Sequence, residues 1–459
     1  MTVPATLWLR RVERGEGPIY LAILRALEAA VAEGELQAGE QLPPQRAVAA
    51  ALGVDFTTVT RAYTAARARG LVEGAVGRGT FVAGRAAEDE AGLIDLSMNL
   101  PPAPKGLNLG KLLKETAQAI LERTDPQALM AYHPAGGSLA QRTAGAAWLA
   151  PCLGKVAPER LLVTPGAQAA LAAILGLLAR PGDAIVTEPL TYPGVRALAA
   201  HMGLRLIPCP VDADGFVPEA LERLCAEASP KAIYCIPTQQ NPTAATMDPA
   251  RREAVAAIAR AAGVAIVEDD AYGRLPHSPL PALATFAPGL TWHIATTAKA
   301  LSPGLRIAFV AAPDTTAAQG LAEALRATTL MPAPLSAAIA TAWIREGTAG
   351  RVLAGVQAEA AERQALARQI LPHAKGSPEG IHIWLDTPAH WPGDRLREVA
   401  QSRGLSLVTA EAFAVGPQAP AGLRISLGGP AKQSVLRQAL QGVAAILAGQ
   451  PAGAGRLVV

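Results

Sequence analysis

Aromatic and charged residues are scarce in this chain of 459 residues, at 4% and 17%. Hydrophobic residues make up 50%, and this share excludes a disordered chain. The longest strongly apolar run, Ala169 to Ala179, is far shorter than the roughly 20 residues that a membrane span requires. The N-terminal sequence MTVPATLWLRR also lacks the basic-then-apolar order of a signal peptide. We therefore expect a cytoplasmic protein without a membrane partner, built from two to four domains at roughly 100–200 residues each.

Cysteine is also rare, and the four cysteines show no C-x-x-C spacing. Four scattered thiols are too few for a disulfide framework, and their spacing does not suit zinc. The seven histidines show no metal-binding spacing either, so we expect no metal site. The net charge of +3 is too small to indicate a nucleic-acid partner by itself, so any such evidence must be local.

The first 82 residues have the pattern of a separate small domain. Apolar residues recur at helical spacing at about residues 19–31, 44–52 and 57–69, with Asp55 placed to cap the third helix. The sequence LVEGAVGRGTFV then predicts two short strands around a glycine-rich tip. This order of three helices and a two-stranded wing is typical of a winged helix-turn-helix.

Polar residues of the third helix are candidates for DNA contact. Thr57, Thr58 and Arg61 are expected to face outward from its N-terminal half, where a helix in the major groove reaches base edges. From residue 57 to 82, four arginines oppose only Glu73, which would place positive charge near phosphates. A small helical domain with ordinary solvated arginines is the alternative.

A family resemblance favours DNA binding. The run G-x-L-x-x-G-x-x-L-P-x-x-R-x-x-A-x-x-L-G-V, followed by T-V-x-x-A-Y and G-x-G-T-F-V, resembles the GntR class of bacterial regulators. The resemblance implies that Arg46 and residues of the third helix contact DNA, and we add Arg78 in the wing. Asp55-Phe56 replaces the usual Ser-Arg and removes a positive side chain, so operator preference is expected to differ.

Residues 83–94 are small, polar and acidic and are predicted to form a short linker. From residue 95 to 459, strands and alanine-rich helices alternate, which predicts an α/β domain with a mainly parallel sheet. The expected strands are 161–164, 184–187, 205–208, 231–236, 264–267, 293–296 and 307–311. Ligands of such sheets bind beyond the carboxyl ends of the strands.

Residues with distinct chemistry follow these strand ends. A Gly166-Ala167-Gln168 turn that opens a helix suits an anion. The later loops present Tyr192, Asn241, Asp269, Tyr272, Thr296, Lys299 and Arg306. A phosphate cradle, an aromatic ring, an amide, a carboxylate, a lysine and an arginine in this order match the needs of pyridoxal phosphate. The lysine would form the Schiff base, and the carboxylate would keep the pyridine nitrogen protonated.

Residues 95–450 resemble the fold type I aminotransferases, through these loops, Y-x-x-x-G-G at 132–137 and GLRISL at 422–427. The resemblance implies that Lys299 is the Schiff-base lysine and that Asp269 pairs with the pyridine nitrogen. It implies coenzyme contacts for Asn241, Tyr272, Tyr192, Gly166, Ala167, Thr296 and Arg306. It further implies a homodimer in which Tyr132 reaches the neighbouring subunit's phosphate, and a substrate carboxylate bound by Arg424.

A GntR-like domain joined to an aminotransferase-like domain with a small C-terminal subdomain at about 370–450 resembles the MocR (PdxR) subgroup. This resemblance implies a regulator that binds operator DNA and senses pyridoxal phosphate, an amino acid, or both. The alternative is an ordinary aminotransferase with a vestigial helix-turn-helix. Both hypotheses depend on Lys299 and Asp269 lying in one cleft.

Overall fold

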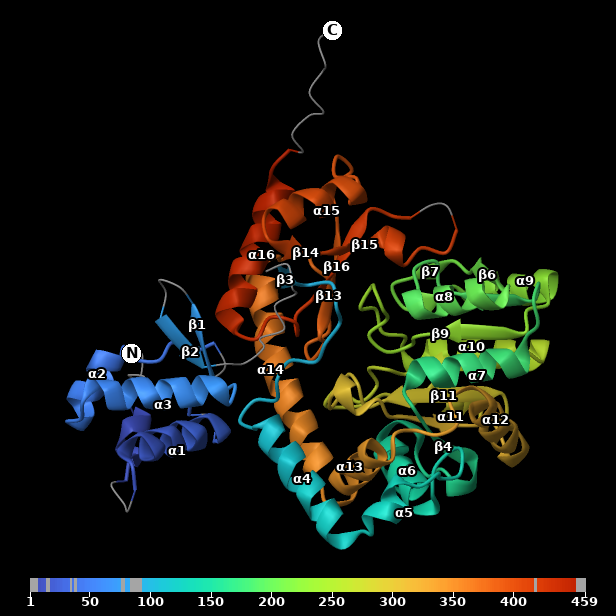
Figure 1. The fold of residues 1–459 in the computed structure, drawn as a ribbon. Helices are drawn as coiled ribbons and strands as arrows, with labels where there is room; N and C mark the ends of the chain where they lie inside the picture. Colours follow the sequence, from blue (N-terminus) through green and yellow to red (C-terminus); the bar gives the residue numbers. More distant parts are fainter. Residues whose placement is uncertain are drawn as a thin grey trace. The chain divides into compact units, whose positions relative to one another are not determined.

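The computed structural model describes residues 7–13, 17–33, 35–36, 39–75, 79–82, 93–416 and 419–450. The chain divides into two compact units, residues 1–88 with 108–114 and residues 89–107 with 115–459 (Figure 1). Within the described ranges, no helix has both the length and the apolarity needed to span a membrane.

The first unit contains three helices followed by a two-stranded hairpin. Its elements are η1 (Leu7–Arg11), α1 (Ile19–Ala32), α2 (Gln45–Leu52), α3 (Phe56–Ala68), β1 (Val72–Ala75) and β2 (Gly79–Val82). The strands are antiparallel, with Val72 opposite Val82. Trp8, Ile23, Leu27, Val59 and Tyr63 are all buried in one apolar core. This arrangement is the predicted winged helix-turn-helix.

A predicted cap defines the start of α3. The Asp55 carboxylate accepts a hydrogen bond from the Thr57 backbone N–H at 2.8 Å. That bond satisfies one of the amide groups that the first helical turn leaves without a partner. The apolar residues Val59, Tyr63 and Ala66 face inward as their spacing predicts.

The second unit is built on a seven-stranded sheet of order β4-β12-β11-β10-β9-β5-β6. These strands are β4 (Leu161–Thr164), β5 (Ala184–Thr187), β6 (Arg205–Pro208), β9 (Ala232–Cys235), β10 (Ala265–Asp269), β11 (Thr291–Thr296) and β12 (Ala308–Ala311). Strand β12 is antiparallel to both neighbours, whereas the pairs from β11 to β6 are parallel. The mainly parallel sheet of the sequence prediction is therefore confirmed.

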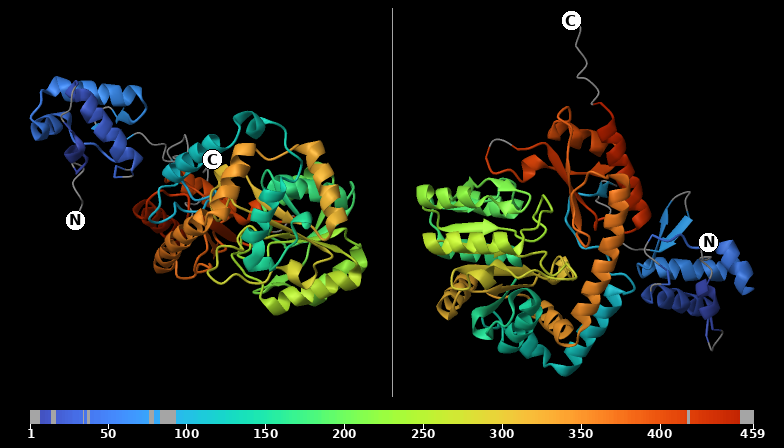
Figure 2. Two further views of the ribbon diagram at one scale, coloured as in Figure 1. Left: turned by 90° about the horizontal axis from the view of Figure 1, so that it is seen from below. Right: turned by 180° about the vertical axis from the view of Figure 1, so that it is seen from behind.

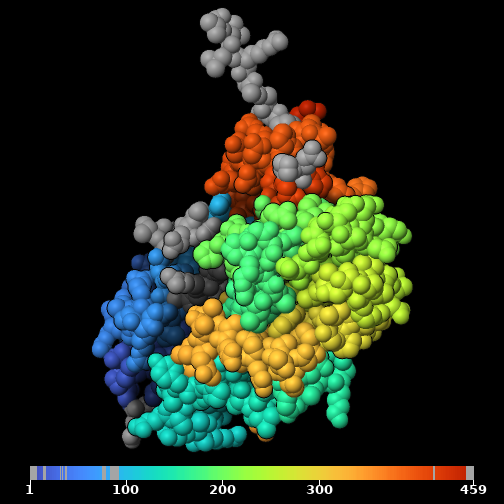
Figure 3. Space-filling view, turned by 90° about the vertical axis from the view of Figure 1, so that its right-hand side faces the viewer, coloured from blue at the N-terminus to red at the C-terminus, as the bar shows by residue number. Residues whose placement is uncertain are grey.

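Helices cover both faces of this sheet (Figure 2). The helices of this half are α5 (Pro126–Met130), α6 (Leu139–Leu153), α7 (Ala167–Leu178), α8 (Pro193–Met202), α9 (Pro218–Ala228), α10 (Pro249–Ala262), α11 (Leu283–Phe286), α12 (Thr315–Thr328) and α13 (Pro334–Arg345). One apolar cluster joins α9 and α10 to β5, β9 and β10, while α7 packs against β4, β11 and β12. Green residues of α8 and α9, yellow residues of α10 and orange residues of α12 form the face seen in Figure 3. Short elements in this half are η2 (Pro158–Arg160), β7 (Val211–Asp212), β8 (Gly215–Phe216) and η3 (Pro303–Leu305).

A smaller antiparallel sheet of order β13-β16-β15 forms the C-terminal part of the second unit. Its elements are β13 (His382–Asp386), α15 (Gly393–Ser402), β14 (Leu405–Ser406), β15 (Val408–Thr409), η4 (Ala410–Ala412), β16 (Gly422–Ser426) and α16 (Gln433–Ala448). Strand β3 (Ile94–Asp95) pairs in parallel with β14, so the last residue of the predicted linker, Ile94, already belongs to this subdomain. The long helices α4 (Leu109–Arg123) and α14 (Thr348–Ile370) complete the chain.

Candidate functional site

A cavity of about 550 Å³ lies in the second unit, beyond the carboxyl ends of β9, β10 and β11. Most of the site residues predicted from the sequence line it, although they are spread over more than 250 positions. Those that line it are Ala167, Tyr192, Asn241, Asp269, Tyr272, Thr296, Lys299, Arg306 and Arg424. The parallel strands bring Asn241, Asp269 and Thr296 together, because their carboxyl ends meet at one edge of the sheet. Arg424 instead comes from β16 of the smaller sheet.

Asp269 is the last residue of β10 and is almost fully buried. Its Oδ2 accepts a hydrogen bond from the Tyr234 hydroxyl at 2.8 Å. Its Oδ1 is buried and has no hydrogen-bond partner in the part of the chain that the structure describes. Burial raises the pKa of this carboxyl to about 6, and the Tyr234 hydrogen bond opposes the rise. One carboxylate oxygen is thus free for a cationic or N–H group in the cavity.

Lys299 follows β11 by three residues, and its amine donates a hydrogen bond to the Asn99 carbonyl at 2.6 Å. Burial, together with the positive charges of Arg424 and Arg306, lowers the pKa of this amine to about 8. Asp269 opposes that shift. A larger share of the amine is therefore neutral, and so nucleophilic, near neutral pH than in an exposed lysine.

The start of α7 has the chemistry of a candidate anion site. Gly166 precedes this helix, whose first-turn N–H groups carry the positive end of the helix dipole. Gly166 has a φ of +97°, and a Cβ there would lie only 3.3 Å from the Arg306 Nη2. Glycine therefore permits the guanidinium of Arg306 to approach the start of α7. Arg306 itself has a left-handed backbone, with a φ of +52°.

Arg424 on β16 brings a second guanidinium into the cavity. Its Nη1 donates to the Asn241 Oδ1 at 2.7 Å, and its Nη2 donates to the Ser97 carbonyl. The guanidinium also lies over the Phe413 ring, 5.0 Å from the centroid. Burial lowers the pKa of Arg424 from its ordinary value. Two arginines at separate positions can each hold an anionic group of a bound molecule.

The structure adds residues that the sequence analysis missed. The Asn99 side-chain amide donates to the Tyr272 hydroxyl at 2.9 Å, and its other contact is the His382 Nδ1 at 3.2 Å. The His382 Nε2 lies 3.1 Å from the Gln240 carbonyl, which can only accept, so this nitrogen carries the proton. Burial lowers the pKa of His382 to about 3, which keeps the ring neutral. The segment SMNLPP around Asn99 carries no motif that could have indicated this role.

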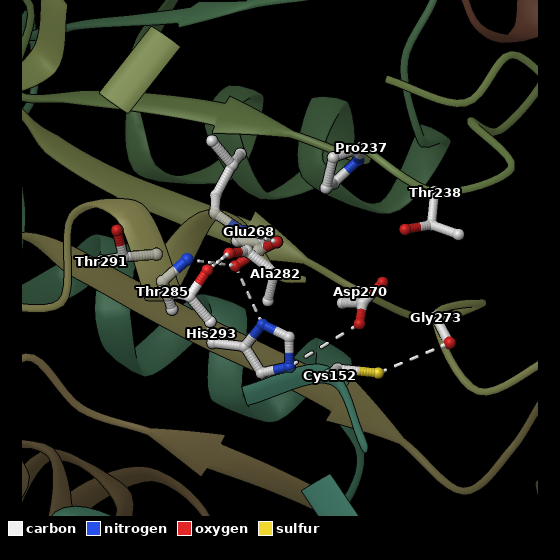
Figure 4. Close-up of polar contacts among 12 residues, drawn as sticks. Cys152, Pro237, Thr238, Glu268, Asp270, Gly273, Ala282, Thr285, Thr291 and His293 are labelled. Atoms are coloured by element: carbon white, nitrogen blue, oxygen red, sulfur yellow. Dashed lines mark hydrogen bonds and ion pairs between the residues drawn. The ribbon is translucent and has the colours of Figure 1, made fainter. Parts of the chain in front are cut away.

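A network of buried charged groups lies beside Asp269 (Figure 4). The His293 Nδ1 contacts the Glu268 Oε2 at 2.9 Å, and its Nε2 lies 3.7 Å from the Asp270 Oδ2. Glu268 also accepts from the Leu283 and Ala284 N–H groups at the start of α11. Although burial acts against it, the neighbouring Glu268 carboxylate raises the pKa of His293. The contacts of Glu268 and His293 thus link β10, the strand that carries Asp269, to β11 and α11.

Some predicted site residues lie outside the cavity. Gly166 is not among the lining residues, and the Tyr132 side chain is 83% exposed and does not line the cavity either. In the first unit, Arg46, Thr57 and Arg61 are exposed and Thr58 is half-buried. The Arg61 guanidinium lies 4.4 Å from the centroid of the Tyr20 ring. Arg78 lies outside the described residues.

Comparison with known proteins gives two family matches. Residues 19–82 match the model of bacterial regulatory proteins of the gntR family. Residues 91–442 match the model of aminotransferases of class I and II, and this match supports pyridoxal phosphate as the cofactor.

Two curated relatives span most of the chain. The uncharacterized HTH-type transcriptional regulator YdeF of Bacillus subtilis is 31% identical over 444 residues, 94% of this chain and 95% of its own. The probable rhizopine catabolism regulatory protein MocR of Rhizobium meliloti is 30% identical over 383 residues, 76% of each chain.

Solved aminotransferases share the fold of the second unit. The α-aminoadipate aminotransferase LysN of Thermus thermophilus, complexed with N-(5'-phosphopyridoxyl)-L-leucine, gives a TM-score of 0.70 at 23% identity. The comparison covers 84% of this chain and 98% of LysN. A kynurenine aminotransferase of Pyrococcus horikoshii gives the same TM-score at 23% identity over 77% of this chain and 90% of its own.

Proposed function

The chain belongs to the MocR-type regulators, which join a GntR-family domain to an aminotransferase class I and II domain. We propose that its coenzyme site is an effector site. In this proposal, the second unit binds pyridoxal phosphate and an amino acid, and the bound state sets the affinity of the first unit for DNA. The observation that supports it is one cavity that contains Lys299, the free oxygen of Asp269 and two arginines.

The residues of the cavity fit this coenzyme. Lys299 supplies the amine that captures the coenzyme aldehyde, and its lowered pKa favours the nucleophilic form. The Asp269 Oδ1, which is buried without a hydrogen-bond partner in the described ranges, would accept the N–H of the ring nitrogen. When bound, the coenzyme supplies an electron sink for chemistry at the α-carbon of an amine.

The remaining cavity residues orient the coenzyme in this proposal. The phosphate lies at the start of α7, held by Gly166, Ala167, Thr296 and Arg306. Asn241 and Tyr272 bind the phenolic oxygen, and Tyr192 stacks on the ring. Each of these roles is an assignment that substitution can test.

We assign the α-carboxylate of the amino acid to Arg424. Its guanidinium has a fork geometry that matches a carboxylate. A carboxylate would take the place of the Asn241 Oδ1 and the Ser97 carbonyl, which now accept its two hydrogen bonds. The effector is therefore expected to be an amino acid with a free α-carboxylate.

We propose that the regulator acts as a homodimer. The exposed Tyr132 would then reach the phosphate of the neighbouring subunit, which explains why it does not line the cavity of its own chain. In the first unit, Arg46, Thr57, Thr58 and Arg61 are the proposed DNA contacts, together with Arg78. A two-fold dimer would read a site with two similar halves.

A band-shift experiment tests this function. The probe is the DNA upstream of the protein's own gene, and the protein is used without ligand, with pyridoxal phosphate, and with the coenzyme plus amino acids. We expect a specific shift whose affinity depends on the coenzyme in wild-type protein but not in Lys299→Ala. A specific shift that the coenzyme leaves unchanged would refute effector sensing, and no specific shift in any state would refute the regulator.

Catalytic transamination is the second candidate function. Arg424 is in place to bind a substrate carboxylate, and Lys299 can serve as base for the proton shift. A relative that is 28% identical over 353 residues is a 2-aminoadipate transaminase of Thermus thermophilus. Turnover of an amino acid and a 2-oxo acid at about 1 per second or faster would favour metabolism, whereas slow half-reactions fit a sensor.

A further inference from the structure

We propose that Tyr234 is a positioning residue that acts on the coenzyme through Asp269. It holds one oxygen of the Asp269 carboxylate, which leaves the other oxygen directed to the ring nitrogen. This inference rests on the proposed function, because it assumes that the cavity binds pyridoxal phosphate.

The two strands that carry these residues fix the contact. Strands β9 and β10 are parallel neighbours, with Tyr234 paired to Val267, two residues before Asp269. The Tyr234 hydroxyl donates to the Asp269 Oδ2 at 2.8 Å, and the tyrosine side chain is completely buried. A buried contact between two sheet residues has little freedom to vary, so the plane of the carboxylate is set by the sheet.

The second oxygen is available to a ligand. Asp269 lines the cavity, whereas Tyr234 does not. Within the described ranges the Asp269 Oδ1 has no partner, although it is buried. A buried carboxylate oxygen without a donor is costly, and a ring N–H in the cavity would satisfy it. The tyrosine therefore contacts Asp269 from the protein side and the coenzyme would contact it from the cavity side.

Tyr234 also favours the ionised form of Asp269. Burial raises the pKa of Tyr234 well above its usual range, so this hydroxyl remains a donor. Its hydrogen bond opposes the rise that burial causes in the pKa of Asp269. The other titratable groups that act on Asp269, or on which Asp269 acts, include Asp270, Lys299, His293, Tyr192, Tyr272 and the buried thiol of Cys235. All of them remain when the Tyr234 hydroxyl alone is removed.

The variant Tyr234→Phe tests the inference in the full-length protein. The probes are pyridoxal phosphate and its analogue in which a CH group replaces the ring nitrogen. We expect the affinity for pyridoxal phosphate to fall about tenfold, because a hydrogen bond to a charged group is lost. Affinity for the analogue should be nearly unchanged, because it has no ring nitrogen for Asp269 to bind.

The pH profile of coenzyme binding gives an independent measurement. Without the hydroxyl the pKa of Asp269 rises, so the carboxylate becomes protonated at a higher pH. The pH at which coenzyme affinity falls on acidification should therefore move upward in Tyr234→Phe. An unchanged profile would overturn the inference.

Cys235→Ala is the matched control, because Cys235 lies beside Tyr234 on the same strand but belongs to the apolar cluster of α9 and α10. It should leave the ratio of the two affinities and the pH profile unchanged. An equal loss of affinity for both probes in Tyr234→Phe would indicate a structural role and overturn the inference. Failure of wild-type protein to bind pyridoxal phosphate would instead refute the proposed function.

Discussion

The amine of Lys299 shows how burial prepares a residue for chemistry. Burial and two nearby guanidinium groups lower its pKa to about 8. At pH 7 about a tenth of this amine is neutral, against less than about a thousandth of an ordinary lysine. Burial and the two arginines proposed to bind anions thus also raise the neutral, nucleophilic share of this amine.

This shift predicts the pH dependence of coenzyme capture. The rate at which apoprotein binds the coenzyme covalently should rise with pH through about 8, where half of the amine is neutral, and level off roughly one pH unit higher. Visible absorbance after rapid mixing measures this rate. A rate that still rises steeply at pH 10 would contradict the lowered pKa, and Lys299→Ala provides the baseline without capture.

Ala244 is a residue with a strained backbone. Its φ of +60° lies in the left-handed region, where a Cβ costs about 1–2 kcal/mol. We predict that Ala244→Gly raises the free energy of unfolding by about 0.5–1 kcal/mol, after the greater chain entropy of glycine is subtracted. Urea unfolding of the variant and of wild type measures this change in the free energy of unfolding. Ala245→Gly, where φ is not positive, should lower stability instead.

At the scale of elements, the presence and order of the strands of the large sheet were the most predictable feature. Short strand patterns predicted all seven strands of the large sheet, including β6, whose residues are exposed or only half-buried. The rule for parallel strands placed Asn241, Asp269 and Thr296 at one edge. Strand ends moved by a residue or two, as in β10, which extends to Asp269 rather than ending at Val267.

The contacts around those strand ends were not predictable from the sequence. Tyr234 reaches Asp269 through the register of two neighbouring strands, and Asn99 meets Tyr272 across 173 positions. Neither residue lies in a motif, and side-chain direction between distant segments follows only from the packed structure. His382, for which the sequence indicated no role beyond the lack of metal-binding spacing, is buried in a hydrogen-bond network at the site.

The cap of α3 gives a prediction for an element. Asp55→Ala removes the acceptor of the Thr57 N–H and should destabilise the first unit by about 1 kcal/mol. Chemical denaturation followed by a probe in this unit measures the loss. Asp125→Ala, which removes a similar cap from α5 in the second unit, should leave that transition unchanged.

At the scale of the whole molecule, the residues proposed to bind DNA and those proposed to bind the coenzyme lie in different units. Each has its own apolar core, and the cavity is lined by residues of the second unit alone. A substitution on the surface of the first unit should therefore alter DNA binding without altering coenzyme binding.

Arg46→Ala tests this separation. We expect lower DNA affinity and a salt dependence reduced by about one unit of slope, because one phosphate contact is lost. Fluorescence anisotropy across salt concentrations measures both. Coenzyme absorbance should match that of wild type, and Arg46→Lys should keep most of the salt slope. Unchanged DNA affinity would contradict the placement of Arg46 in the interface.

The stretch Ser97–Asn99 connects residues of the cavity with the part of the chain that follows the first unit. Its carbonyls accept hydrogen bonds from Arg424 and Lys299, the two cations assigned to the amino acid and the coenzyme. We expect a molecule bound to both Lys299 and Arg424 to compete with these two carbonyls for hydrogen bonds. In the sequence, the same stretch comes shortly after the predicted linker, residues 83–94, which follows the DNA-binding unit. Thermodynamic reciprocity then requires that operator DNA, if it restrains this stretch, changes small-molecule affinity by the same factor by which the small molecule changes DNA affinity.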